Sequence, residues 1–333
     1  MSKLSRKQFL LTLGTGLAAG LIPAWLFKRR DLCSSENAYR QPIHERTGTG
    51  GVREGGSYGS MVHPPNYLTA AALDRFHLTS PPESGEVKIS MTVTEQTLEI
   101  AHHTNFDAWT FDGMLPAKII RVREGTRLKI HLKNLTTEPH SLHFHGSHDP
   151  VEDGWEPVPA GGEAHYSLTA GPVGLHPYHC HVPPLKSHIG KGLYGLMIID
   201  PPAPRAAAFE QVLIFSSFDL RNSGKGDLYA FNGVCGFYDR YPIKVKVGEL
   251  VRLYLLNVAE HDPLMSFHIH AQTFDVFRTG TSTTPSEHTD VVSLAPMERA
   301  IIEFRLKKPG RYMFHPHQSQ MAENGGMGWI VAV

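Results

Sequence analysis

Cysteine is scarce in this sequence, which excludes a fold held together by a disulfide framework. Only Cys33, Cys180 and Cys235 occur among 333 residues, and three cysteines cannot form such a framework. An excess of charge of one sign is also absent, since 32 basic and 32 acidic side chains give a formal net charge of zero. This balance gives no indication of a nucleic acid or an anionic membrane surface as a partner. Cys235 is expected to be a small buried hydrophobic side chain.

Turn-forming residues and histidine are, in contrast, abundant. Glycine occurs 31 times and proline 24 times, and many segments alternate between apolar and polar residues. This pattern favours an all-β chain with many turns. The 21 histidines are denser than is usual for histidine without a dedicated role. The length is sufficient for about two domains, each with its own core.

The first part of the chain has the pattern of an export signal. Lys3, Arg6 and Lys7 precede an uncharged stretch, 8–27, that is rich in leucine, alanine and glycine. Its start is similar to a twin-arginine signal in which Lys7 replaces the second arginine. A retained membrane anchor is the alternative, since a stretch of this length could span a bilayer. Residues 1–30 therefore predict an exported protein, periplasmic or extracellular.

Two copies of one β-domain follow an irregular arm, 31–85, in which only Leu68–Phe76 has the pattern of a short helix. Each copy has two alternating strands around a glycine turn, then a His-x-His pair, a further strand and a second pair before a closing hydrophobic strand. This repetition indicates an internally duplicated β-sandwich. The proline-rich segment 201–204 is the expected linker, so the two domains are predicted at 86–203 and 204–333.

Four His-x-His pairs recur in these domains, and one of them contains a cysteine. The paired histidines are His143 and His145, His179 and His181, His268 and His270, and His315 and His317. In a β-strand, residues i and i+2 point to the same face, so both imidazoles of a pair converge on one spot. Cys180, between two of them, faces the opposite way and is placed to bind a second metal. Imidazoles suit copper, zinc, iron and nickel, and one thiolate with two imidazoles suits blue copper.

From about residue 86 onward the chain resembles the two-domain multicopper oxidases, which are relatives of laccases and copper nitrite reductases. The resemblance rests on the segment 140–146, on 179–181 followed by His188, and on the two cysteine-free pairs. It implies an all-β chain of two tandem cupredoxin-like Greek-key β-sandwich domains. It also implies type 1, type 2 and binuclear type 3 copper, with about four copper ions per chain.

The family's type 1 ligands match His140, Cys180 and His188. Its axial position falls on Leu193, five residues after His188. Leucine cannot bind a metal, so the resemblance implies a three-coordinate copper with a relatively high potential. Met197 is the nearest alternative axial ligand, but it lies in the closing strand and is expected to belong to the core.

The family's trinuclear cluster would use all eight paired histidines. By resemblance, the type 2 copper would be held by His143 and His268, and the type 3 pair by His145, His179, His181, His270, His315 and His317. Burying so many imidazoles without shared partners would be costly, which argues against a purely structural role. The second domain lacks a type 1 site, because Met265 and Pro316 stand where its histidine and cysteine would be.

Two carboxylates are candidate catalytic residues. Asp153 resembles the family's acidic residue near the type 2 copper, where it would orient a ligand or relay protons to O2. The alternative for Asp153 is a turn residue before Gly154. Glu323 follows the last pair and would serve similarly, or else is a solvated loop charge.

These features predict a laccase-like oxidase that couples one-electron oxidation of a phenol, an aromatic amine or a low-valent metal ion to reduction of O2 to water. Copper nitrite reductases are the alternative class of enzyme. The resemblance implies that those enzymes have an aspartate at the position of His143, which argues against this alternative. A non-enzymatic copper carrier is the other alternative, although storage does not require Cys180 between two sites.

Ligand counting predicts the assembly. Each domain supplies half of the cluster imidazoles, so the cluster must lie between a first and a second domain. In two-domain relatives these come from neighbouring chains, which implies a homotrimer with the clusters at its interfaces. The donor is not identified, because no methionine-rich segment indicates Cu(I) and no acidic patch indicates Fe(II). Residues 182–186 are expected to border the donor site.

Overall fold

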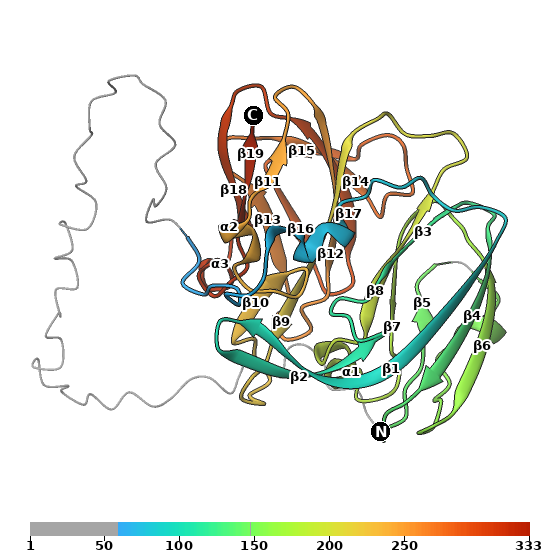
Figure 1. Cartoon of the computed structure of the whole chain (residues 1–333). Helices are drawn as coiled ribbons and strands as arrows, with labels where there is room; N and C mark the ends of the chain where they lie inside the picture. The colour runs from blue at the N-terminus through green and yellow to red at the C-terminus, as the bar shows by residue number, and fades with distance from the viewer. Residues whose placement is uncertain (1–58, 147) are drawn as a thin grey trace, which may run out of the picture. The chain divides into compact units, whose positions relative to one another are not determined.

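The computed structural model describes residues 59–146 and 148–333, which are built mainly from strands (Figure 1). The strands form four sheets, and each sheet takes its strands from only one half of the described chain. This arrangement confirms the predicted all-β fold class with tandem β-sandwich domains. No helix in these residues is long and apolar enough to cross a membrane. The predicted export segment and Cys33 lie outside the described residues.

The first sandwich pairs two four-stranded sheets, ordered β2-β1-β4-β6 and β3-β8-β7-β5. Its strands are β1 (Glu86–Ala101), β2 (Thr104–Phe111), β3 (Ile119–Arg123), β4 (Arg127–Asn134), β5 (His143–Phe144), β6 (Glu163–Thr169), β7 (Gly174–His179) and β8 (Tyr194–Asp200). Exposed and buried residues alternate along β4 and β6, as in a sheet with one face on a core. Side chains of both sheets share that core, among them Val93, Leu128, Phe144 and Ile199. Short helices, η2 (Pro150–Glu152) and α1 (Leu185–Gly190), lie in the loops before β6 and β8.

The second sandwich pairs a six-stranded sheet, β10-β9-β12-β17-β14-β15, with a five-stranded sheet, β11-β19-β18-β13-β16. Its elements are β9 (Phe209–Phe218), β10 (Leu228–Phe231), α2 (Phe237–Arg240), β11 (Ile243–Val245), β12 (Leu250–Asn257), β13 (Met265–Ile269), β14 (Phe274–Arg278), β15 (Glu287–Thr289), β16 (Val291–Leu294), β17 (Arg299–Arg305), β18 (Gly310–Pro316), α3 (Ser319–Glu323) and β19 (Gly328–Ala332). Aromatic rings fill its core, where Phe231 lies 5.0 Å from Phe215 and 5.3 Å from Phe314 between ring centroids. Cys235 is fully buried in the same core, as expected.

β8 is buried on both faces, which explains its unbroken hydrophobic sequence. Met197 and Ile199 belong to the core of the first sandwich, whereas Leu196 and Ile198 pack into the core of the second. A strand covered on both sides has a continuous apolar run rather than an alternating pattern. The segment 201–208 then connects β8 to β9 and contains the boundary predicted at 203/204.

A buried ion-pair network links the two sandwiches. Arg121 of β3 lies 2.7 Å from Asp200 and 2.9 Å from Glu210 of β9. Glu210 also lies 2.7 Å from Arg252, which is 2.6 Å from Glu303. Each guanidinium is thus shared by two carboxylates, which is the arrangement that buried charges require.

The described part of the arm, 59–85, contains one short helix. This helix, η1 (Ala70–Phe76), is a 3-10 helix within the segment Leu68–Phe76 for which the sequence indicated a short helix. Its first turn lacks a side-chain cap, and Leu73 departs from helical geometry. Phe76 is fully buried, so packing of the apolar side chains holds this segment in place.

Candidate metal centres

His140, Cys180 and His188 meet at one buried point of the first sandwich. His140 precedes β5, Cys180 directly follows β7, and His188 lies in α1. The Nδ1 atoms of the two histidines are 3.2 Å apart, and Cys180 Sγ lies 3.3 Å from that of His188 and 3.9 Å from that of His140. His140 and Cys180 are 0% exposed and His188 is 5% exposed. The loop, the strand end and the helix therefore deliver three donor atoms to one place.

These three donors fit a metal ion. Bonds of about 2.0 to 2.3 Å in a trigonal arrangement place the donor atoms roughly 3.5 Å apart, close to the separations observed. Burial and the neighbouring His188 lower the pKa of His140 to about 4, so this imidazole is neutral at neutral pH. Two neutral nitrogens that face each other need a proton or a metal between them. Two imidazoles and a thiolate are the donor set of blue copper.

The thiol needs a cation to ionise. Burial raises the pKa of Cys180, although the Ser141 N–H donates to Sγ at 3.4 Å. A bound metal supplies the missing positive charge, since metal binding displaces the thiol proton. Leu193 is fully buried in the same core cluster, and its carbonyl accepts a hydrogen bond from the Cys180 N–H at 3.1 Å. Met197 belongs to this core as expected, and the axial role of Leu193 stays a prediction.

Trp109 of β2 also lies at this centre, and the sequence gave no sign of it. Its ring centroid is 4.9 Å from that of His140 and 4.8 Å from that of His188. Trp109 precedes both residues by many positions, and no spacing rule connects it to them. Only the pairing of β2 with β1 and the position of the following loops bring it to the metal centre.

Four further histidines form a first half-cluster in the same domain, which consists of His143, His145, His179 and His181. His143 of β5 is directly paired with His179 of β7 in the sheet. Their ring centroids are 5.2 Å apart, and the ring of His181 lies 5.1 Å from that of His143. The Nε2 atoms of His145 and His179 face each other at 3.0 Å. Burial lowers the pKa of His145 to about 3 and that of His179 to about 4, so both are neutral.

The second domain repeats this geometry in a second half-cluster, which consists of His268, His270, His315 and His317. His268 of β13 is paired with His315 of β18, as His143 is with His179. The Nε2 atoms of His270 and His315 face each other at 2.9 Å. Burial lowers the pKa of both His270 and His315. His270 and His317 are nevertheless exposed in the chain as described, so this half-cluster opens to the surface.

Backbone carbonyls orient the imidazoles in the same way in both half-clusters. Nδ1 of His143 lies 2.9 Å from the Asp153 carbonyl, and Nδ1 of His268 lies 2.7 Å from the Asp290 carbonyl. His179 and His315 use the carbonyl of the residue that follows each of them, at 2.8 and 2.7 Å. A proton on each Nδ1 leaves Nε2 free as a metal donor, which is how ligating histidines are commonly held. The sequence gave no indication of Asp290, because the connecting loops of the two domains differ in length.

No hydrogen bond or ring contact joins the two half-clusters within the described residues. Four groups in the described residues could hold a metal, and all four lie in the first domain. They are His140, Cys180 and His188; His143, His145 and His179; Glu99, His102 and His103; and His131, Glu163 and His165. The structure therefore brings together the predicted residues within each domain but not across domains.

The two predicted carboxylates differ in their surroundings. Asp153 Oδ1 lies 3.3 Å from Nδ1 of His143 and 3.6 Å from Nε2 of His148. The Glu323 side chain, in α3, is exposed and makes no hydrogen bond or ion pair with the histidines in the described part of the chain. Its carbonyl instead accepts the Met61 N–H at 2.9 Å. A role in proton transfer stays a prediction for both residues.

Family models described as multicopper oxidase match both halves of the chain, at residues 92–204 and 215–333. A solved structure described as a multicopper oxidase is 35% identical, with a TM-score of 0.76, and covers 80% of this chain and 97% of its own. A copper-containing nitrite reductase of Neisseria meningitidis is 28% identical over 262 residues, which cover 72% of this chain and 68% of that protein. Laccase-8 of Oryza sativa is 27% identical over 246 residues, which cover 63% of this chain and 43% of that laccase.

Proposed function

Because this chain belongs to the multicopper oxidase family, we propose that it is a laccase-like oxidase. It would couple one-electron oxidation of a phenolic, aromatic amine or metal-ion donor to the four-electron reduction of O2 to water. The observation that carries this proposal is the pair of matching half-clusters, the first of which is linked covalently to Cys180 through His179 and His181. Bound copper would supply the redox chemistry, which is one-electron transfer at the blue centre and reduction of O2 at the cluster.

The donor geometry supports a division of ligands between the centres. His140, Cys180 and His188 would hold type 1 copper, with Leu193 at the axial position. By the resemblance to multicopper oxidases, His143 and His268 would hold type 2 copper, and both use an Asp carbonyl for Nδ1 in equivalent positions. The type 3 pair would be held by the remaining six, which are His145, His179, His181, His270, His315 and His317.

The chain's own groups would hold these ligands and connect the centres. Nδ1–H groups donate to carbonyls and aim Nε2 at the metal position, so binding requires little rearrangement. Cys180 lies between His179 and His181, and therefore a short covalent path runs from the thiolate to the first half-cluster. The Asp153 carboxylate, 3.3 Å from Nδ1 of His143, is positioned to hold a proton beside this imidazole.

A copper nitrite reductase is the alternative, supported by the similarity to the Neisseria protein. Nitrite reduction at a single catalytic copper needs only three imidazoles, whereas each half-cluster here has four imidazoles within ring contact. The additional imidazoles favour a multinuclear centre and thus O2 as the acceptor.

Ligand counting supports a homotrimer in which a first domain of one chain faces a second domain of the next. The exposed imidazoles of the second half-cluster would then be completed by a neighbouring chain. The basic and apolar residues at the start of the sequence support export to the periplasm or the medium. Cell fractionation with detection of the mature N-terminus tests the export proposal, and a cytoplasmic full-length chain would contradict it.

Metal analysis and turnover test the function together. We expect about four copper ions per chain, a blue absorption band, and O2 uptake with a phenolic donor. Cys180→Ser should lose the blue band and O2 uptake while it retains the cluster copper. Two copper ions per chain with turnover of nitrite would support the reductase instead, and full copper loading without any turnover would support a copper carrier.

A further inference from the structure

Both imidazoles of the mononuclear centre are shielded from solvent. His140 is 0% exposed and His188 is 5% exposed, so a reductant in solution has little direct access to either ring in this chain. The indole of Trp109 packs on both rings, with centroid distances of 4.9 and 4.8 Å. Trp109 itself is only partly buried. An electron from solution that crosses Trp109 therefore reaches either ligand through a single van der Waals contact.

The backbone fixes Trp109 over the centre. Its N–H donates to the Lys191 carbonyl at 3.0 Å, which joins β2 to the residue after α1. Gly192 has φ +120, and a Cβ there would lie 2.8 Å from the Trp109 carbonyl and 2.7 Å from Leu115. Such close packing requires glycine at this position. The indole thus has a fixed position relative to the helix that carries His188.

The outer side of Trp109 borders a recess of about 310 Å³, which we name the indole recess. Its polar lining residues are Glu95, Gln96, Thr97, Asp107 and Lys191. In the β1–β2 pair Glu95 is opposite Trp109 and Thr97 is opposite Asp107, so these four side chains share one face of the hairpin. The volume suits a small single-ring molecule rather than a large one.

We propose that Trp109 is the residue through which electrons reach the type 1 centre, from a small donor bound in the indole recess. This proposal rests on the proposed oxidase function and names the docking site for its electron donor. In each transfer the donor loses one electron and the type 1 copper gains one. A hydroxylic donor also releases one proton, which passes to solvent at the open recess.

Lys191 determines whether Trp109 is itself oxidised during electron transfer. Its Nζ lies 4.3 Å from the centroid of the indole ring, in a cation–π contact. A positive charge at this distance opposes removal of an electron from the indole. Trp109 therefore serves as a bridge between donor and ligands and is not itself oxidised. The same charge favours the reduced metal, so Lys191→Met should lower the reduction potential of the type 1 centre.

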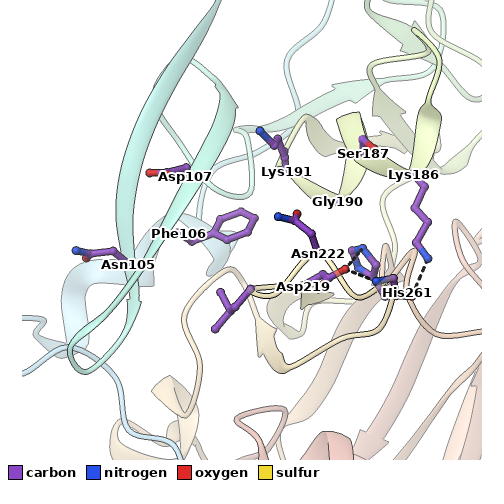
Figure 2. A pocket seen from close by; sticks show the side chains of 12 residues that line it. Asn105, Phe106, Asp107, Lys186, Ser187, Gly190, Lys191, Asp219, Asn222 and His261 are labelled. Carbon is purple, nitrogen blue, oxygen red and sulfur yellow. Dashed lines mark hydrogen bonds and ion pairs between the residues drawn. The ribbon is translucent and has the colours of Figure 1, made fainter.

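A larger cavity of about 530 Å³ lies beside α1 and shares Asp107 and Lys191 with the indole recess (Figure 2). Lys186, Ser187 and Gly190 of α1 line it, together with Asp219 and His261 of the second domain. His188 itself does not line this cavity, whereas the ring of Trp109, which lines the indole recess, packs on His188. Of the residues expected to border the donor site, 182–186, only Lys186 lines this cavity.

To decide between the indole recess and the cavity beside α1 as the donor site, each is filled with a larger side chain in the copper-loaded holoenzyme. Thr97→Phe occupies the indole recess, and Asn105→Phe, on the same hairpin, occupies the cavity beside α1. Bleaching of the blue band by hydroquinone is followed anaerobically, so that the result does not depend on O2 reduction. We expect Thr97→Phe to lower the second-order rate constant about tenfold or more, with an unchanged blue band and little effect of Asn105→Phe. The opposite pattern, or no effect of Thr97→Phe, overturns the proposal.

Trp109 is tested with Trp109→Leu and Trp109→Phe. Trp329→Phe is the matched control, because Trp329 also carries a cation–π partner, Arg311 at 4.6 Å, but lies in the second domain. We expect Trp109→Leu to slow the anaerobic bleaching and Trp109→Phe to lose most of the copper-dependent quenching of tryptophan fluorescence. An intact blue band with unchanged bleaching in Trp109→Leu overturns the role of the indole. If Trp109→Leu binds no copper, Thr97→Phe and the quenching in Trp109→Phe decide. Absence of O2 uptake in the wild type would count only against the oxidase function.

Discussion

At the scale of single residues, the two kinds of centre use opposite nitrogens of imidazole. The mononuclear centre presents Nδ1 of His140 and His188 to the thiol. In the half-clusters, Nδ1 of His143 and His268 is bound to a carbonyl, which leaves Nε2 for metal. The hydrogen bond made by one ring nitrogen decides which nitrogen binds the metal. The carbonyl partners are therefore as important for copper binding as the histidines themselves.

Gly154 allows one of these carbonyls to be in position, and Gly154→Ala should displace it. Gly154 has φ +73, and an added Cβ would lie 2.0 Å from the Leu142 carbonyl, directly before His143. We expect a loss of stability of more than about 1 kcal/mol, since the conformation is strained for alanine in addition to the clash. Type 2 copper should be lost while the blue band remains. Urea unfolding and copper-specific EPR measure the two effects, and an unchanged type 2 signal would contradict this role of the turn.

The variant Asp153→Asn distinguishes the role of the Asp153 carboxylate from that of its backbone carbonyl. The variant keeps the backbone bond to His143 but removes the charge that lies 3.3 Å from Nδ1. If this group relays protons during O2 reduction, kcat should fall by about 100-fold, with normal copper content. Asp290→Asn is the control, because Asp290 Oδ2 lies farther from its histidine, at 4.0 Å. Equal effects of the two substitutions on steady-state O2 uptake would argue against a specific relay at Asp153.

The sequence was sufficient to identify the eight paired histidines and Cys180, because a spacing of two residues on a strand fixes which side chains converge. His140 and His188 were identified by the family resemblance. It was not sufficient for Asp290 or Trp109. Asp290 reaches His268 through a loop whose length has no counterpart in the first domain. Trp109 reaches His140 and His188 through packing between β2 and α1. Neither contact has a local sequence pattern.

At the scale of secondary structure, the strands at the contact between the domains carry charged side chains that are buried. Glu210 of β9 contacts both Arg121 of the first sandwich and Arg252 of the second. Tyr254 also donates a hydrogen bond to Glu210 at 2.5 Å. The alternating patterns around Arg121 and Arg252 predicted strands correctly, but they gave no indication that these charges would be buried. The sequence also did not indicate that β8 is buried on both faces, since its apolar run would fit a core strand of either domain.

Glu210→Gln should destabilise the contact between the domains. The substitution removes a buried carboxylate and leaves two guanidinium groups with one partner each, at a cost of about 3 kcal/mol. Urea unfolding of the copper-free protein at neutral pH measures the difference. Glu287→Gln is a suitable control, because the ion pair of Glu287 with Arg278 is much more exposed and should contribute little. A cost for Glu210→Gln as small as that of the control would contradict a stabilising network.

The same carboxylate predicts the direction of a pH effect. Although burial alone would raise it, the Tyr254 hydroxyl and the two guanidinium groups hold the pKa of Glu210 below its ordinary value of 4.5. A carboxylate with a lowered pKa stabilises the folded state above its ordinary pKa, and this stabilisation is lost as the pH falls through the lowered value. The difference in unfolding free energy between wild type and Glu210→Gln should therefore be constant above pH 4.5 and shrink in more acidic solution. A difference that grows on acidification would contradict this assignment.

At the scale of the whole molecule, the duplication was evident from sequence, but the completion of the cluster was not. The repeated strand and histidine pattern predicted two sandwiches with matching half-clusters. Whether His143 and His268 meet within a chain depends on how the sandwiches are oriented, which no repeat pattern encodes. In the described residues the half-clusters are not in contact, and the second one is partly open to solvent. Completion by another chain is the solution that ligand counting favours.

This arrangement predicts that the two kinds of copper respond differently to dissociation. His140, Cys180 and His188 belong to one chain and are buried in it, so type 1 copper should remain when the oligomer separates. The cluster copper should be released, because each half-cluster retains only half of the ligands. Light scattering coupled to copper analysis over a dilution series measures both quantities. We expect trimers with about four copper ions per chain and monomers that are still blue but hold about one. Monomers that keep the full copper content would show that the cluster forms within a single chain.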